Sequence, residues 1–249
     1  MKNQLQELIT KKDFANSIQA LQAKLDVGLN RMEELRTKYN DNLPDSCPNG
    51  STNFIYQIKV RDLEPFKVSC ATSPPGWTVI QRRIDGSENF NRTWNDYKSG
   101  FGNVSGEFFI GLEKLHRMTE ERPHELYIKL GMVDGSTSYA QYDDFKIGSE
   151  EELYELKNLG KYSGEAGDSL TFNKNQKFST IDRDNDSASM NCANEFGAWW
   201  NKNCSNSKLN AKYYKDGKGD DGIHWASFQK NDWSISLTFV EMMIRPKSL

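Results

Sequence analysis

The stretch Ser179–Cys204, with the sequence STIDRDNDSASMNCANEFGAWWNKNC, brings acidic, sulfur-bearing and aromatic side chains close together. Three aspartates alternate with polar residues, and two cysteines then enclose a pair of tryptophans: Asp182, Asp184, Asp186, Cys192, Cys204, Trp199 and Trp200. Carboxylates at this spacing in a turned loop repel one another, and a divalent cation such as Ca²⁺ relieves that repulsion. The stretch therefore predicts either a Ca²⁺-binding loop or an acidic loop that faces solvent.

The aspartate loop does not match the EF-hand pattern. That pattern requires glycine at its sixth position and a bidentate glutamate at its twelfth. Counted from Asp182, these positions hold Ser187 and Ala193. A calcium site here would therefore be another kind of loop, with ligands drawn from carboxylates, backbone carbonyls and water.

Cysteines and glycosylation sequons favour an extracellular protein with two disulfides, although four buried free thiols are the alternative. The cysteines are Cys47, Cys70, Cys192 and Cys204, and sequons begin, among other positions, at Asn49, Asn91, Asn103 and Asn185. None of the cysteine spacings is the C-x-x-C of zinc and thioredoxin sites. We expect Asn185 to be unglycosylated because it lies inside the aspartate cluster. The N-terminus lacks an apolar signal peptide, so the chain is mature or truncated, or the protein stays inside the cell.

Composition argues against several classes of function. The net charge is −3 with both signs spread along the chain, which is unlike the basic face of a nucleic-acid binder. No run of residues approaches the 18 apolar positions of a membrane span. The three histidines, His116, His124 and His224, show no metal-binding helical spacing, and G-x-S-x-G, P-loop and GxGxxG motifs are missing. We therefore predict that the protein is not an enzyme and that His224 is structural.

Residues 1–44 differ in texture from the remainder and predict a helix. Apolar residues repeat in heptads, with Ile18, Leu25, Met32 and Tyr39 at position a and Phe14, Leu21 and Leu35 at position d. Gly28 interrupts the d positions, and Pro44 cannot continue a helix. The pattern favours a short parallel coiled coil that makes a dimer or trimer, whereas an amphipathic helix lying on its own globular domain is the alternative. Residues 45–249 form the second predicted domain.

From Cys47 onward the sequence predicts short strands and few helices. The strand-like runs are 54–60, 76–84, 107–112, 125–133 and 234–245, separated by turn residues. Short helices are predicted at Thr93–Ser99 and Glu150–Lys157. After Gly160 the chain is polar and rich in glycine up to Ile235, and a long irregular segment of this kind indicates a functional loop region.

Several motifs then carry a family resemblance. The segment Gly76–His116, GWTVIQRRIDGSENFNRTWNDYKSGFGNVSGEFFIGLEKLH, resembles the first half of a fibrinogen C-terminal domain. The second half of such a domain is resembled, in the same order along the chain, by FSTIDRDND, NCA, GAWWNKNC, SKLNAKYY, GDDGIHWASF and EMMIRP. The match covers Cys47 to Pro246. A helical oligomerising stalk ahead of such a domain is also usual in this family, as in ficolins and angiopoietins.

The resemblance implies a fold and a metal site. The fold would be α+β, with a twisted and mainly antiparallel sheet, short helices and a loop-rich calcium subdomain. It implies the disulfides Cys47–Cys70 and Cys192–Cys204. It also implies a Ca²⁺ ion bound by the Asp184 and Asp186 carboxylates and by the carbonyls of Ala188 and Met190, with Asp182 outside this set. A cis peptide at Asn203–Cys204 is a further expectation.

The resemblance also implies a ligand pocket, although the match there is partial. The pocket residues would be Phe196, Asn203, Cys204, Ser205, Gly219, Asp220 and Asn231. Family lectins bind an acetyl group between aromatic walls, and here Gly219 and Asn231 stand where aromatics are usual, while Ser205 replaces a histidine and Ala211 a glycine. Trp199, Trp200 and Trp225 are predicted to lie in the core. Glu195 and Asp220 would give the pocket an acidic character that suits an amine-bearing or peptide ligand.

Two functions follow from the resemblance. The first is a secreted, Ca²⁺-dependent lectin that recognises carbohydrate, such as acetylated glycans on microbial surfaces, in innate immunity. The second is a receptor or adhesion ligand that binds protein through the same pocket region. The altered pocket leaves both open. A homo-oligomer is expected in either case, because several weak sites on one particle gain avidity.

Overall fold

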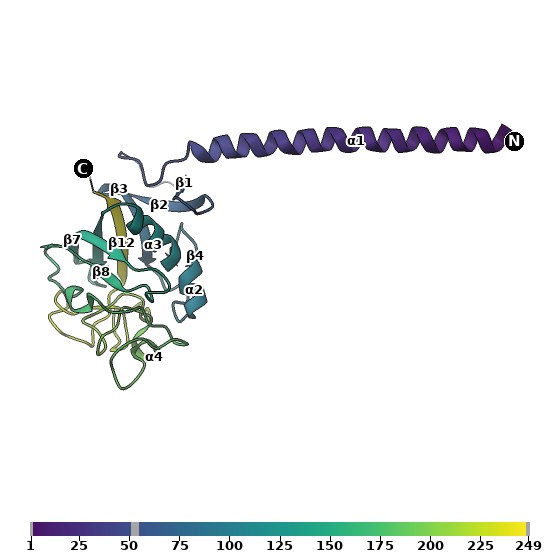
Figure 1. The fold of residues 1–249 in the computed structure, drawn as a ribbon. Helices are drawn as coiled ribbons and strands as arrows, with labels where there is room; N and C mark the ends of the chain where they lie inside the picture. Colours follow the sequence, from purple (N-terminus) through teal and green to yellow (C-terminus); the bar gives the residue numbers. More distant parts are fainter. Residues whose placement is uncertain (1, 51–54, 248–249) are drawn as a thin grey trace. The chain divides into compact units, whose positions relative to one another are not determined.

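The computed structural model describes residues 2–50 and 55–247, which divide into two units at Leu43 and Pro44. The first unit is one long helix, α1 (Lys2–Asp41). The second is a globe that contains all of the strands (Figure 1). Among the described residues, no helix combines the length and the apolarity needed to cross a membrane.

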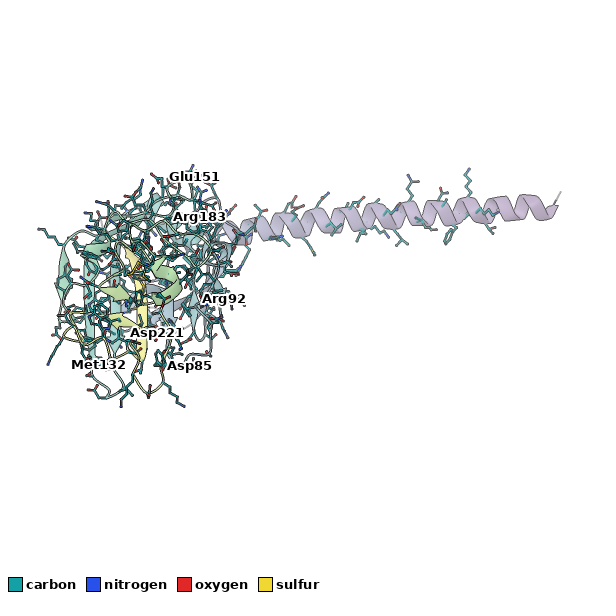
Figure 2. All side chains as sticks on the ribbon, turned by 90° about the horizontal axis from the view of Figure 1, so that it is seen from below. Asp85, Arg92, Met132, Glu151, Arg183 and Asp221 are labelled. Atoms are coloured by element: carbon teal, nitrogen blue, oxygen red, sulfur yellow. A yellow bond between two sulfur atoms is a disulfide. The ribbon has the colours of Figure 1, made fainter. Side chains whose placement is uncertain are left out.

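Helix α1 carries its apolar side chains in the open. Figure 2 shows side chains standing out along the helix. The heptad residues are exposed by 41% or more, and they are Phe14, Ile18, Leu21, Leu25, Met32, Leu35 and Tyr39. A helix in water gains most of its stability from packing an apolar face, and α1 has no such packing within its own unit.

The globe is organised around one antiparallel sheet whose path runs β1-β2-β3-β12-β6-β7-β8. These strands are β1 (Ile55–Ile58), β2 (Phe66–Thr72), β3 (Pro75–Arg83), β6 (His124–Gly131), β7 (Thr137–Ile147), β8 (Leu156–Asn158) and β12 (Phe239–Pro246). The short strand β5 (Phe108–Phe109) pairs with β3, β4 (Phe101–Gly102) pairs with β5, and β9 (Tyr162–Gly164) pairs with β7. The last strand of the chain, β12, pairs with β3 on one side and β6 on the other, so it forms the centre of the sheet.

Two short helices cover the sheet. Helix α2 (Trp94–Ser99) begins with a capping box, in which Thr93 and Asp96 each satisfy the backbone N–H of the other. Helix α3 (Leu112–Glu121) buries Leu112, Leu115 and Met118. The α+β class, the antiparallel sheet and the short helices confirm the predicted fold.

Residues 165–235 form the loop-rich end of the globe (Figure 1). Regular structure there is limited to a 3₁₀ turn η1 (Thr171–Asn173), helix α4 (Cys192–Phe196) and the strand pair β10 (Ser207–Lys208) and β11 (His224–Trp225). The three tryptophans Trp199, Trp200 and Trp225 are at most 1% exposed, which confirms that they belong to the core.

The predicted helix at Glu150–Lys157 is wrong. The segment forms turns and then strand β8, and Leu153 and Tyr154 have φ values of +57° and +48°. A residue other than glycine adopts this left-handed conformation only under tertiary constraint. Here Tyr154 is fully buried, and its hydroxyl donates to Glu113 on α3 (3.0 Å).

Candidate functional site

The aspartate loop separates a structural carboxylate from the two predicted metal ligands. Asp182 accepts hydrogen bonds from the Trp94 backbone N–H (2.8 Å) and the Thr180 hydroxyl (2.8 Å), so it joins the loop to the start of α2. Asp184 accepts from the Asp186 N–H (3.1 Å). Asp182 therefore has a structural partner of its own, in line with its predicted place outside the metal site.

Asp186 connects the loop to helix α4. Its two carboxylate oxygens accept hydrogen bonds from the N–H groups of Ala188 (2.9 Å) and Cys192 (3.0 Å). Burial raises the pKa of Asp186 above its usual value, and the charge of Asp184 adds to that shift while these hydrogen bonds oppose it. No ion pair to either aspartate occurs in the part of the chain that the structure describes.

The donors present at this loop fit a calcium ion. The carbonyl oxygens of Ala188 and Met190 accept no hydrogen bond within residues 2–50 and 55–247, and both are free to bind a cation. No group of three or more His, Cys, Asp or Glu side chains gathers among these residues, so an ion here would depend on backbone oxygens as well. Hard oxygen ligands of this mixed kind are those that Ca²⁺ takes.

Both expected disulfides are formed, and they fix the two ends of the globe. Cys47 pairs with Cys70 of β2, and Cys192 pairs with Cys204. The expected cis peptide at Asn203–Cys204 is wrong, since Ser73–Pro74 is the one cis bond among the described residues. The chain turns instead at Cys204 itself, which has a φ of +50°. The Cys204 N–H donates to the Cys192 sulfur (2.9 Å), so it is not presented to a ligand.

The residues of the predicted acetyl pocket differ in burial and in local contacts. Ser205 is buried, and its hydroxyl accepts from the side chain of Asn173 (2.6 Å). Gly219 lies under Tyr214, because a Cβ atom added to it would come within 2.4 Å of that ring. Asn203, Asp220 and Asn231 are exposed.

Around Phe196 the structure assembles residues that the sequence did not indicate. The Lys208 ammonium lies 3.4 Å from the centroid of the Phe196 ring and 4.7 Å from that of Trp233. Trp233 stacks on His224, with 3.8 Å between ring centroids. The second aromatic wall at this place is thus Trp233, two residues beyond Asn231. The ring face that would bury an acetyl methyl is covered by Lys208.

A cleft of about 510 Å³ lies beside this group and was not predicted as a unit. Its walls are residues 86–91, the start of α4 and residues 210–213, and Asp221 (labelled in Figure 2) also lines it. The lining is mostly polar: Ser87, Glu88, Asn89, Asn91, Asn194, Glu195, Asn210 and Lys212, with Phe90 and Tyr213 as the aromatic members. Asn91 begins a sequon, so a glycan attached there would occupy part of the cleft.

Buried polar side chains hold both walls of the cleft. Glu107, which is 2% exposed, accepts four backbone N–H groups from residues 84–88 at 2.7–3.1 Å. Arg83 donates to the carbonyls of Leu209 (3.2 Å) and Ala211 (2.7 Å) on the opposite side. Burial lowers the pKa of Arg83 to about 10, and the nearby Glu107 carboxylate opposes that shift. The cleft is therefore preformed, as ligand sites usually are.

The aspartate loop is connected to the same wall through α4. Two side chains accept hydrogen bonds at the start of this helix. Asn191 caps it by accepting from the Ala193 N–H (2.9 Å), and Asp186 accepts from the Cys192 N–H. Ala193, Asn194 and Glu195 then line the cleft. Any ion that stiffens the Asp184–Met190 loop would stiffen this wall.

Fold and site together define an α+β globe, held by two disulfides, with a preformed polar cleft at its loop-rich end. The family model for the C-terminal globular domain of fibrinogen beta and gamma chains matches residues 42–247. The chain belongs to this family.

Similar proteins agree with this assignment. Fibrinogen-like protein 1 of Bos taurus is 44% identical over 212 residues, which is 77% of this chain and 67% of the relative. Tenascin-R of Gallus gallus is 43% identical over 214 residues, which cover 82% of this chain but 15% of that protein. This chain thus spans a small part of tenascin-R.

Solved structures show the same globe. The fibrinogen-like globe of human ANGPTL2 matches with a TM-score of 0.76 and 41% identity, over 79% of this chain and 94% of that chain. The lamprey fibrin D-dimer, solved with the peptide ligand Gly-His-Arg-Pro-amide, matches with a TM-score of 0.76 and 30% identity, over 100% and 94% of the two chains.

Proposed function

We propose that this chain is a secreted, oligomeric binding protein whose globe recognises a protein or peptide ligand in the cleft beside α4. The observation that carries the proposal is the cleft itself, since its volume of about 510 Å³ lies in the range of ligand sites and its walls are fixed by buried polar groups. A solved relative holds a tetrapeptide amide, which shows that this fold can bind peptides. Two disulfides favour an oxidising, extracellular location.

Binding is favoured over catalysis because the histidines are engaged in the fold. Burial lowers the pKa of both His124 and His224 to about 4, far from the value that suits a general base at neutral pH. His116 is 5% exposed, and its Nδ1 lies 3.2 Å from the carbonyl of Ile147.

Calcium would act in this proposal as a brace. Asp184 and Asp186, with the carbonyls of Ala188 and Met190, would hold the ion and fix the wall that contains α4. The exposed heptad residues of α1 would join two or three chains, and this multivalency would raise avidity for a repeated ligand by roughly 10²–10⁴.

A Ca²⁺-dependent lectin is the second candidate. Its specific support is the amide-rich lining of the cleft, because Asn89, Asn91 and Asn194 offer donors and acceptors of the kind that sugar hydroxyls require. The covered face of Phe196 argues against an acetyl slot of the usual kind.

The two candidates separate in one experiment. The full chain is applied to an array of extracellular protein domains and to a glycan array, each in millimolar Ca²⁺ and in EDTA. The proposal expects saturable binding on the protein array. Saturable binding confined to the glycan array, and lost in EDTA, would establish the lectin instead.

A further inference from the structure

Lys208 holds an ammonium group in an unusual setting. The residue lies in β10, opposite His224 of β11, and is 4% exposed. No hydrogen bond or ion pair of its Nζ occurs in the part of the chain that the structure describes. The ammonium instead faces two aromatic rings, Phe196 at 3.4 Å and Trp233 at 4.7 Å from the centroids.

Burying a charge without hydrogen bonds is costly, so the rings must supply most of the compensation. The negative face of an aromatic ring attracts a cation within about 6 Å of its centroid, and the attraction grows when the cation is desolvated. Asp220 and Asp221 add a longer-range attraction, but burial outweighs it and lowers the pKa of Lys208 to about 8. The Lys208 ammonium therefore lies on two ring faces, and their attraction does not fully offset the cost of burying its charge.

The walls around this ammonium are partly open to a ligand. Trp233 is 37% exposed and is held in place by stacking on the buried His224. Phe196 is half-buried at the end of α4. An incoming cation would meet the same two faces, and the displaced Lys208 ammonium would regain its hydration near Asp220.

We propose that Phe196 and Trp233 form a binding slot for an ammonium group, and that Lys208 occupies this slot in the free protein as an internal competitor. The ligand class is a primary or methylated ammonium, as on a lysine side chain or a chain N-terminus of a partner. Exchange replaces one cation by another on the same rings, so no net charge is buried. None of the slot residues lines the cleft, although Glu195 and Gly197, on either side of Phe196, do.

The probe is tetramethylammonium chloride, with sodium chloride at equal ionic strength as the reference. Lys208→Ala empties the slot, whereas Lys208→Met fills it with a neutral side chain of similar length. We expect Lys208→Ala to bind tetramethylammonium at least tenfold more tightly than wild type or Lys208→Met, as measured by tryptophan fluorescence. Trp233→Ala in the Lys208→Ala background should abolish this binding.

A second measurement uses the wild-type chain. Acetylation of lysines by an activated ester is followed by mass spectrometry with and without tetramethylammonium. Displacement should accelerate acetylation of Lys208 several-fold, while the exposed Lys212 reacts at an unchanged rate. Two results would overturn the proposal. One is equal binding of tetramethylammonium by wild type, Lys208→Ala and Lys208→Met. The other is a folded Lys208→Ala that binds no better than wild type, together with unchanged acetylation of Lys208 in wild type.

Discussion

Single buried polar residues determine the geometry of the binding end. Glu107 fixes one wall of the cleft through four backbone N–H groups, and Arg83 fixes the other through two carbonyls. Each of these groups would leave several polar partners unsatisfied if it were removed, and a buried unsatisfied group costs about 1–3 kcal/mol. Arg83 lines the cleft itself, whereas Glu107 acts on the cleft only through the backbone that it holds.

Asp184 should be essential for stabilisation by calcium. Asp184→Asn keeps an oxygen that can accept from the Asp186 N–H but removes the charge that a cation requires. Wild type should melt at a higher temperature in millimolar Ca²⁺ than in EDTA, by an amount that corresponds to about 2.7 kcal/mol when Ca²⁺ is at a hundred times its Kd. Asp184→Asn should lose most of this difference, as calorimetry can show.

Asp182→Asn is the matched control, because Asp182 bonds to Trp94 and Thr180 in the fold. Its melting temperature should change by the same amount in both buffers, so that the calcium-dependent difference remains. A wild-type melting curve that is identical in Ca²⁺ and EDTA would contradict the site.

Lys208 should make stability depend on pH. Its pKa is about 8 in the folded chain and 10.5 in the unfolded chain, so the unfolded state binds more protons between these values and stability rises with pH across this window. Lys208→Met removes the effect. The free energy of unfolding of wild type, relative to Lys208→Met, should therefore increase by up to about 3 kcal/mol from pH 7 to 10.5.

Denaturant titrations of both proteins across this range provide the test. Other titrating groups cancel in the comparison. A constant difference between the two free energies would show that the Lys208 ammonium is not destabilised by burial.

At the scale of elements, the helices and strands that could be predicted are those whose formation depends on residues close together in the sequence. A helix was predicted at Thr93–Ser99 and the structure confirms it as α2, which begins with the local Thr93–Asp96 capping box. The turns at residues 150–155 were missed because burial of Tyr154 overrides local helix propensity there. The strand β7 was missed as well because polar residues such as Gln141, Asp143 and Asp144 interrupt its apolar pattern, although its partner β6 directly precedes it in the chain.

The candidate site was predictable only in part. The aspartate pattern and the cysteines could be recognised from their residue types and spacing. Lys208 could not, because a lysine usually lies at the surface and only the folded chain places it on Phe196 and Trp233. Trp233 could have been found from the sequence, because it is an aromatic residue only two positions after Asn231, which was assigned to the third aromatic wall.

Gly28 should limit the strength of the α1 coiled coil. It occupies a d position, and a Cβ atom added there meets no neighbouring atom within 4 Å. Gly28→Leu would remove a helix penalty of about 1 kcal/mol and supply a missing seam residue. Oligomer dissociation, followed by analytical ultracentrifugation, should therefore shift to lower concentration.

Gly28→Ala is the control, because it restores helix propensity without filling the seam. It should strengthen the oligomer less than Gly28→Leu. If wild type and both variants sediment as monomers at micromolar concentration, α1 does not oligomerise the chain.

At the scale of the whole molecule, the chain combines a long helix whose heptad residues are exposed with a globe that carries a preformed cleft. Under the proposed function the two units have different tasks: the helix would bring chains together and the globe would recognise a ligand. Each globe would contribute one modest site, and joined chains would dissociate from a repeated ligand far more slowly than one chain.

The central claim is that the globe binds protein through the cleft beside α4. The most direct measurement is a titration of wild type, Glu195→Lys and Glu121→Lys over the extracellular protein array. Glu195 is exposed and lines the cleft, whereas Glu121 is exposed at the end of α3 and does not line it. The account predicts that Glu195→Lys needs at least a tenfold higher concentration for half-saturation of the wild-type targets, while Glu121→Lys matches wild type. Equal titration curves for all three proteins would contradict it.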